Sequence, residues 1–74
     1  MDDVERLREL VALTFDLPLE AITPATTQDN CARWDSLAHL NLMLAVEDAF
    51  GLTLTVEEMA AMTSVAAIAR RVRG

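Results

Sequence analysis

Residues 35–51, DSLAHLNLMLAVEDAFG, carry the strongest structural signal in this chain. Apolar residues recur in them at spacings of three and four, as in an α-helix with one wide apolar face. These residues are Leu37, Leu40, Met43, Leu44, Val46 and Phe50. Asp35 is a good N-cap, and Gly51 stands where a left-handed residue ends a helix. The stretch therefore predicts a long helix that begins at Ser36.

The residues before this helix divide into another helix and a loop. Helical spacing near the start, with Asp2 and Glu5 in the pattern of a capping box, predicts a helix that fades near Phe15–Leu17. Its apolar stripe consists of Val4, Leu7, Leu10, Val11 and Thr14. Pro18 disfavours helical geometry in the residue before it. Residues 16–34 show no sustained period and predict a long ordered loop, pinned by Leu19 and Ile22; such loops are often functional.

Two further helices are predicted after Gly51. Residues 52–54 form a short extended link, and Thr55 with Glu58 makes a capping box that opens a brief helix through Ala60–Met62. Thr63 or Ser64 caps a last helix, which ends in three arginines. Its apolar positions are Val65, Ile68, Ala69 and Val72. The expected fold is an all-α, small four-helix bundle (three main helices and one short helix), with a long loop between the first two helices and residues 1–74 as a single domain.

Composition excludes several classes of protein. The chain has 74 residues, 53% of them hydrophobic, which is enough for one small core. Its formal charge of −6 argues against nucleic acid or an anionic membrane as a partner. The acidic N-terminus is unlike a signal peptide, and no apolar run approaches the roughly 20 residues that span a bilayer. We expect a soluble cytoplasmic monomer whose partners present basic patches.

Ser36 is the candidate for chemistry. If Asp35 caps the helix, Ser36 is its first residue, and its hydroxyl stands beside backbone N–H groups that lack acceptors. Such a helix end favours an anion, so a phosphate esterified to Ser36 would be stabilised there. From position alone, an ordinary helix-start serine with no further role is the favoured interpretation, because Asp and Ser are common at helix starts.

Residues 34–68, WDSLAHLNLMLAVEDAFGLTLTVEEMAAMTSVAAI, closely resemble the acyl carrier protein family. The matching features are the Asp-Ser-Leu motif at 35–37, the apolar helix after it, the EDAFG run at 47–51 and the two later helix starts. In this family the motif serine receives 4′-phosphopantetheine from coenzyme A through a phosphopantetheinyl transferase, and the thiol of the arm carries acyl groups as thioesters. The resemblance implies that Ser36 is the attachment site. It also implies that Asp35 helps the transferase and its metal to recognise the site.

The resemblance also implies a carrier with no catalytic activity of its own. Its partners are the transferase and the enzymes that load and process acyl or aminoacyl groups. Leu37 matches a position that docks partner enzymes, and Glu47 and Asp48 keep part of an acidic docking face. Trp34 is either a further docking residue or, by default, a core residue that pins the loop.

Some positions depart from the pattern of general fatty-acid carriers. Arg33-Trp34 stands where those carriers usually have small residues, and residues 36–46 contain no acid. This favours a dedicated carrier of a specialised pathway, of the polyketide or nonribosomal-peptide type. Peptidyl carriers usually have two glycines before the serine, and their absence here favours an acyl cargo over an aminoacyl one.

Other functional interpretations of the same residues are weaker. Ser36 and His39 could form a nucleophile–base pair, but no group to orient His39 and no oxyanion hole is apparent, so His39 is expected at the helix surface or as a partner contact. Cys31 with His39 supplies two of the four ligands of a structural zinc, so no metal site is predicted, and Cys31 is expected to be a small apolar loop residue. Ordinary core packing is expected of Met43, Met59 and Met62.

The alternative function from another class is a helical adaptor that binds proteins without a prosthetic group. An adaptor would have no need of Ser36, whereas a carrier would lose all loading without it.

Overall fold

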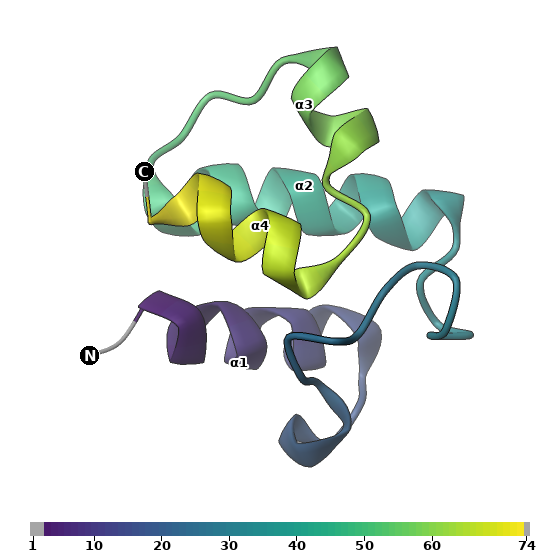
Figure 1. Ribbon diagram of the computed structural model, residues 1–74. Coiled ribbons are helices and arrows are strands. Elements are labelled where there is room, and N and C mark those ends of the chain that lie inside the picture. The colour runs from purple at the N-terminus through teal and green to yellow at the C-terminus, as the bar shows by residue number, and fades with distance from the viewer. Residues whose placement is uncertain (1–2, 74) are drawn as a thin grey trace.

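Four α-helices and one 3₁₀ turn make up residues 3–73, the part of the chain that the computed structural model describes (Figure 1). In chain order they are α1 (Asp3–Phe15), η1 (Leu19–Ala21), α2 (Ser36–Phe50), α3 (Val56–Ala61) and α4 (Val65–Val72). No β-strand occurs among these residues, although an isolated bridge pairs Thr27 with Ser64. The predicted all-α fold, with a long loop between its first two helices, is confirmed.

Helix α1 is the common support of the bundle, because it packs against both α2 and α4. In Figure 1, α2 and α4 run in the direction opposite to α1, and α3 lies on the far side of them from α1. The three long helices contribute mostly aliphatic residues and one aromatic ring to the core. These residues are Leu7, Val11, Ala12 and Phe15 of α1, Leu42, Met43 and Val46 of α2, and Val65, Ile68 and Ala69 of α4.

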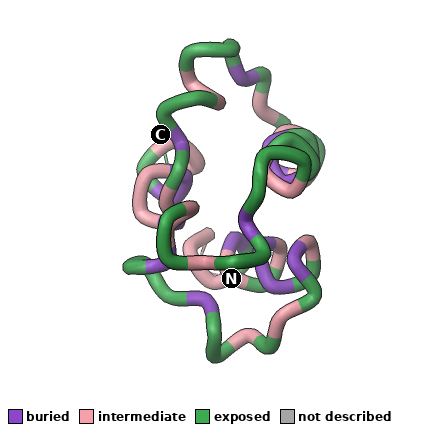
Figure 2. Tube along the Cα trace, turned by 90° about the vertical axis from the view of Figure 1, so that its right-hand side faces the viewer, coloured by how far each residue is buried: buried purple, intermediate pink, exposed green. Residues whose placement is uncertain are grey.

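The buried side of α2 differs from the predicted apolar face. Leu37, Leu40 and Leu44 are 69%, 49% and 52% exposed, whereas Leu42, which was not in the predicted face, is fully buried. Figure 2 views α2 nearly end-on and shows its exposed positions on the outer side of the bundle. The correction has a simple cause. Apolar residues surround more than half of this helix, and only one side of it can face α1 and α4.

The long loop is held to the helices at several points. Ile22 and Trp34 insert into the core, and the Arg8 guanidinium of α1 donates to Ile22 O at 2.8 Å and to Leu19 O at 3.2 Å. Val65 N–H donates to Thr26 O at 2.9 Å, which joins the loop to the start of α4. The loop is therefore ordered, as predicted. The turn η1 was not predicted, because three residues are too few to show a period.

The helix ends agree with the predicted caps. The Asp35 side chain accepts from Ala38 N–H, and Gly51 has the left-handed φ of 65°. Thr55 and Glu58 form the capping box of α3, and Ser64, the second of the two candidates, caps α4. The proposed Asp2–Glu5 box lies outside the described residues, since it requires Asp2.

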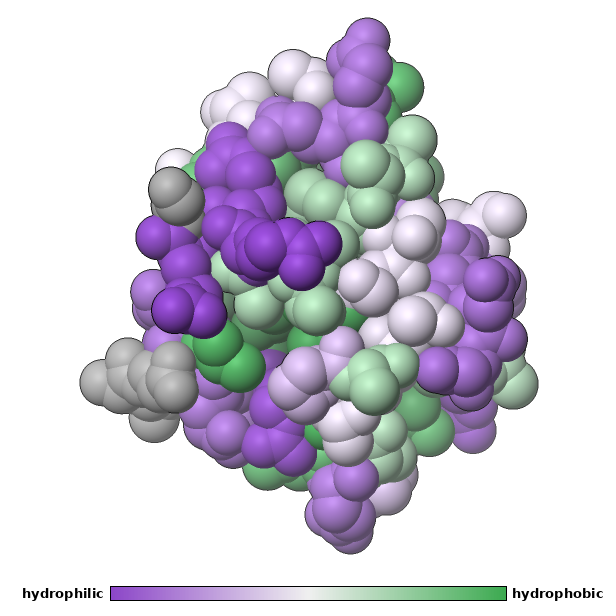
Figure 3. Space-filling view, in the orientation of Figure 1, coloured by the Kyte–Doolittle hydropathy of each residue, from purple (hydrophilic) through white to green (hydrophobic). Residues whose placement is uncertain are grey.

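Hydrophilic and apolar residues are distributed unevenly over the surface. Figure 3 shows hydrophilic residues gathered over the C-terminal end of α4, where Arg70 and Arg71 occupy the last turn, and more apolar residues in the middle of this face. Cations at a helix C-terminus are favoured by the helix dipole. Within residues 3–73, every helix is too short or too polar to cross a bilayer.

Candidate functional site

Ser36 is the first residue of α2, and its side chain is exposed. Asp35 precedes it in extended geometry and accepts a hydrogen bond from Ala38 N–H through Oδ1 at 2.8 Å. The amide groups of Ser36 and Leu37 lie in the first turn, before any acceptor that the helix itself supplies. The Ser36 hydroxyl forms no hydrogen bond with another described residue. It is available to an incoming reagent and stands at the positive end of a 15-residue helix.

A group attached through a phosphodiester fits this position. The single negative charge of the phosphate would lie beside the unpaired N–H groups of the first turn, the arrangement in which helix N-termini stabilise anions. The Asp35 carboxylate is turned towards Ala38 N–H, so one of its oxygens is already neutralised in part by a donor. Because Ser36 is exposed, an arm attached to it can extend into solvent without displacing a core residue.

Ser36 also differs from the other serine of the chain. The sequence contains two serines, Ser36 and Ser64. Ser64 is half-buried, and its hydroxyl accepts a hydrogen bond from Ala67 N–H at 3.0 Å as the N-cap of α4. Ser36 is therefore the serine whose hydroxyl is both exposed and uncommitted.

Trp34 lies in the core and is only 2% exposed. Its ring contacts Phe15, with 5.4 Å between ring centroids, and stacks on His39 at 6.0 Å. A partner surface cannot reach such a side chain, so the docking role predicted for Trp34 is wrong and the core alternative is confirmed. The physical reason is the size of the indole ring, whose burial removes more apolar surface from water than any aliphatic residue of the loop would.

His39 is not a surface residue and does not serve Ser36 as a base. Its Nδ1 accepts from Trp34 Nε1–H at 2.9 Å, and its Nε2 lies 2.7 Å from Met59 O. An indole N–H can only donate, so Nδ1 is the acceptor and Nε2 carries the proton that it donates to the carbonyl. Both ring nitrogens are thus engaged. The expectation of a surface or partner-contacting histidine is corrected, and the nucleophile–base pair with Ser36 is absent.

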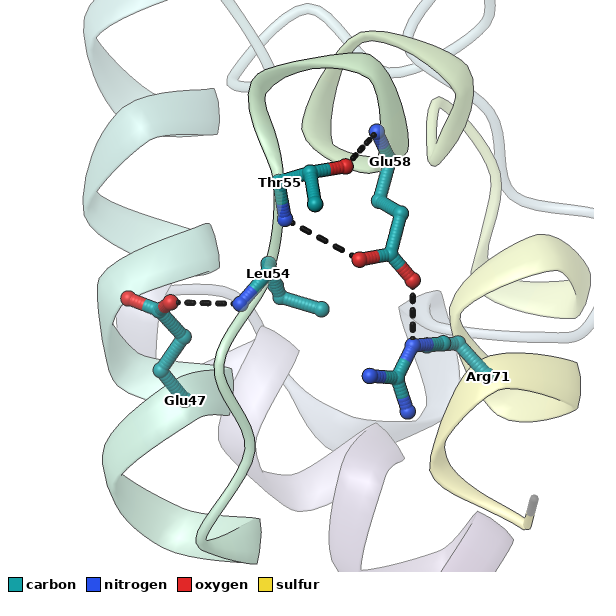
Figure 4. A network of polar contacts seen from close by, with 5 residues as sticks. All are labelled: Glu47, Leu54, Thr55, Glu58 and Arg71. Carbon is teal, nitrogen blue, oxygen red and sulfur yellow. Dashed lines mark hydrogen bonds and ion pairs between the residues drawn. The ribbon is translucent and has the colours of Figure 1, made fainter.

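The outward side of α2 presents three exposed leucines, Leu37, Leu40 and Leu44, which we name the leucine ridge. Asp48 follows Leu44 by one turn and is exposed, and its carboxylate pairs with no other described residue. Glu47 is half-buried, and its Oε2 accepts a hydrogen bond from Leu54 N–H at 2.8 Å, which holds the link after α2 to the helix (Figure 4). No Lys or Arg occurs from Trp34 to Met62. The ridge is an apolar strip with Glu47 and Asp48 beyond one end, where the Arg6 guanidinium of α1 also donates to Ala49 O at 3.2 Å.

The remaining candidates have structural roles. Cys31 is half-buried and packs against the core, as expected. Met43 and Met62 are buried, and Met59 packs against the core, which confirms core packing for all three. Across residues 3–73, no three His, Cys, Asp or Glu side chains gather closely enough to hold a metal ion.

Comparison with known proteins identifies the family of this chain. A family model described as "Phosphopantetheine attachment site" matches residues 5–72, nearly the whole chain. A search of curated proteins found no match. The matched range includes the start of α2 and all the helices that support it.

Proposed function

Because this chain belongs to the phosphopantetheine attachment site family, we propose that it is a carrier whose arm is joined to the Ser36 hydroxyl. Domains of this family are the site of a covalently attached 4′-phosphopantetheine and act as carriers. One observation supports Ser36 above all. It is the exposed, uncommitted serine of the two in the chain, and it stands at the N-terminus of a long helix.

When attached, the arm supplies a thiol that holds an acyl group as a thioester. The chain itself contributes the oxygen of Ser36, the helix N-terminus that stabilises the phosphodiester and the capped, rigid start of α2. His39 does not serve Ser36 as a base, since both of its ring nitrogens are engaged. Removal of the Ser36 proton is therefore assigned to the phosphopantetheinyl transferase, and Asp35 is proposed to help the transferase and its metal to recognise the site.

The leucine ridge and the acids beside it are the proposed docking surface for partner enzymes. Leu37 lies next to Ser36, so an enzyme that contacts the ridge also reaches the arm. Exposed apolar side chains of this kind favour a partner with an apolar patch, and Glu47 and Asp48 favour basic residues at its rim. We propose acyl-loading and acyl-processing enzymes of a polyketide or nonribosomal-peptide type of pathway as these partners, with an aminoacyl cargo as the alternative.

A helical adaptor without an arm is the second candidate. The observation that favours it is the same leucine ridge, because an exposed apolar strip is a binding surface with or without a prosthetic group.

The test is the intact mass of the protein after incubation with coenzyme A, Mg²⁺ and a broad-specificity phosphopantetheinyl transferase. We expect one phosphopantetheine on the wild type and none on Ser36→Ala. Ser64→Ala is the matched control, because it removes the other serine and should still be loaded. Loading of Ser36→Ala would move the attachment site elsewhere. A folded wild type that stays unmodified by an active transferase would favour the adaptor.

A further inference from the structure

One side chain, His39, joins the end of the long loop to helix α3. On one side its Nδ1 receives the indole N–H of Trp34, two residues before Ser36. On the other side its Nε2 donates to Met59 O in α3. Two hydrogen bonds through His39 thus connect Trp34, at the end of the loop that precedes Ser36, with Met59 of α3.

The indole bond closes the end of the loop against the first turn of α2. Asp35 and Ser36 lie between Trp34 and His39 in the sequence, and His39 N–H donates to Asp35 O at 2.8 Å. Trp34 N–H in turn donates to Cys31 O at 3.0 Å. The segment that presents Ser36 is therefore held at both of its ends, by backbone bonds and by the stacked pair of Trp34 and His39.

The bond to Met59 has a separate structural effect. Helix α3 has six residues, and none of them is buried. Within residues 3–73, the His39–Met59 contact is the only hydrogen bond between a residue of α2 and a residue of α3. Its loss should loosen α3 and leave the start of α2 in place.

We propose that His39 is a positioning residue for the modification of Ser36, and that it acts through the indole bond to Trp34 and not through Met59. This inference rests on the proposed function, because it concerns the transferase reaction at Ser36. With the bond in place, the transferase meets Asp35 and Ser36 already ordered. Without it, the loop end samples other conformations, and part of the binding energy is used to order it.

Two substitutions separate the two bonds, because the side-chain amide of each variant can replace only one of the two ring nitrogens in its hydrogen bond. In His39→Asn, the Oδ1 oxygen takes the place of Nδ1 and accepts from Trp34, but the side chain is too short for Met59. In His39→Gln, the amide nitrogen takes the place of Nε2 and donates to Met59 O, while the indole N–H loses its acceptor. Trp34→Phe is a second way to remove the indole bond while keeping a buried ring.

The experiment measures kcat and KM for loading of each variant by the transferase, with the folded fraction checked by circular dichroism. We expect His39→Asn to load within about threefold of the wild type. We expect His39→Gln and Trp34→Phe to show a KM about five- to tenfold higher at nearly unchanged kcat, as for the loss of one hydrogen bond that orders the bound state. The effect on α3 should rank the two variants the other way. In hydrogen exchange, the α3 amides should exchange faster in His39→Asn, which lacks the bond to Met59, than in His39→Gln.

The outcomes separate this inference from the function on which it rests. If the wild type is loaded and His39→Asn and His39→Gln load equally well, Ser36 remains the site and the positioning role is overturned. The same conclusion follows if loading tracks only the folded fraction. If the wild type takes up no phosphopantetheine, the carrier function fails, and with it any positioning for that reaction.

Discussion

Glu58 and Arg71 join helix α3 to helix α4, with 2.5 Å between Glu58 Oε2 and Arg71 Nε (Figure 4). The other oxygen of Glu58 accepts from Thr55 N–H at 3.0 Å as half of the capping box. The backbone hydrogen bond from Thr55, followed by the pairing with Arg71, lowers the pKa of Glu58 from its ordinary value of about 4.5. One carboxylate thus closes the start of a short helix and holds it to its neighbour.

The pH dependence of stability should report this carboxylate. Because the pKa of Glu58 is lower in the folded chain, its stabilising contribution is complete above about pH 4.5 and is lost as the pH falls through the lower folded value. We expect Glu58→Gln to destabilise the chain in urea at pH 6 and to differ much less from the wild type at pH 3. Glu57→Gln, in the same turn but without the ion pair, is the control. An equal difference at both pH values would contradict the prediction.

Two substitutions at Asp35 separate capping from recognition. Asp35→Ala removes the acceptor of Ala38 N–H and should cost about 1 kcal/mol of unfolding free energy, as for other lost N-caps. Asp35→Asn keeps an oxygen in the same place, so its stability should stay within about 0.5 kcal/mol of the wild type. If the transferase and its metal recognise the carboxylate, Asp35→Asn will be loaded more slowly than the wild type, although its stability is nearly unchanged. Loading at the wild-type rate would show that the charge is not recognised.

The same leucine-to-alanine change should lower stability on the buried side of α2 and slow loading on the exposed side. Leu42 is fully buried, so Leu42→Ala should cost about 2–5 kcal/mol. Leu37 is 69% exposed, so Leu37→Ala should change stability by less than about 0.5 kcal/mol. If the leucine ridge is the docking surface, Leu37→Ala will slow loading by the transferase, although it is as stable as the wild type. Unchanged loading kinetics would remove Leu37 from the docking surface.

Gly51 is required for its backbone conformation and not for space. Its φ is +65°, and a Cβ built on it meets no atom within 4 Å. Gly51→Ala should therefore cost about 1–2 kcal/mol through left-handed strain alone. Asn tolerates this region better, so Gly51→Asn should cost less. Thermal unfolding of the wild type and the two variants tests this order, and equal melting temperatures for the wild type and Gly51→Ala would contradict it.

The sequence predicted the features that depend on near neighbours. The caps at Asp35 and Thr55 were predicted, and the cap of α4 was predicted as Thr63 or Ser64, because each cap and its partner lie three residues apart. The end of α2 at Gly51 followed from the same local logic. Ser36 was identified as the candidate site because its motif and its place at a helix start are both properties of a short segment.

The roles of Trp34 and His39 could not be derived in this way. His39 contacts Met59 across 20 residues of sequence, and no spacing along one helix indicates such a partner. The Trp34–His39 bond requires a particular ring orientation, which the packing of Phe15 and the loop imposes. Sequence reasoning therefore left Trp34 with two possible roles and placed His39 on the surface.

By itself, the sequence determined that the chain forms helices, where α2 and α3 begin, the start of α4 to within one residue, and that Ser36 stands first in the long helix α2. Which side of α2 is buried depended on the tertiary structure. Leucines occur on both sides of this helix, so the local pattern does not specify which side is buried. Packing of α2 in the bundle removes Leu42 and Val46 from water and leaves Leu37, Leu40 and Leu44 exposed to solvent, because only one side of the helix can face the core.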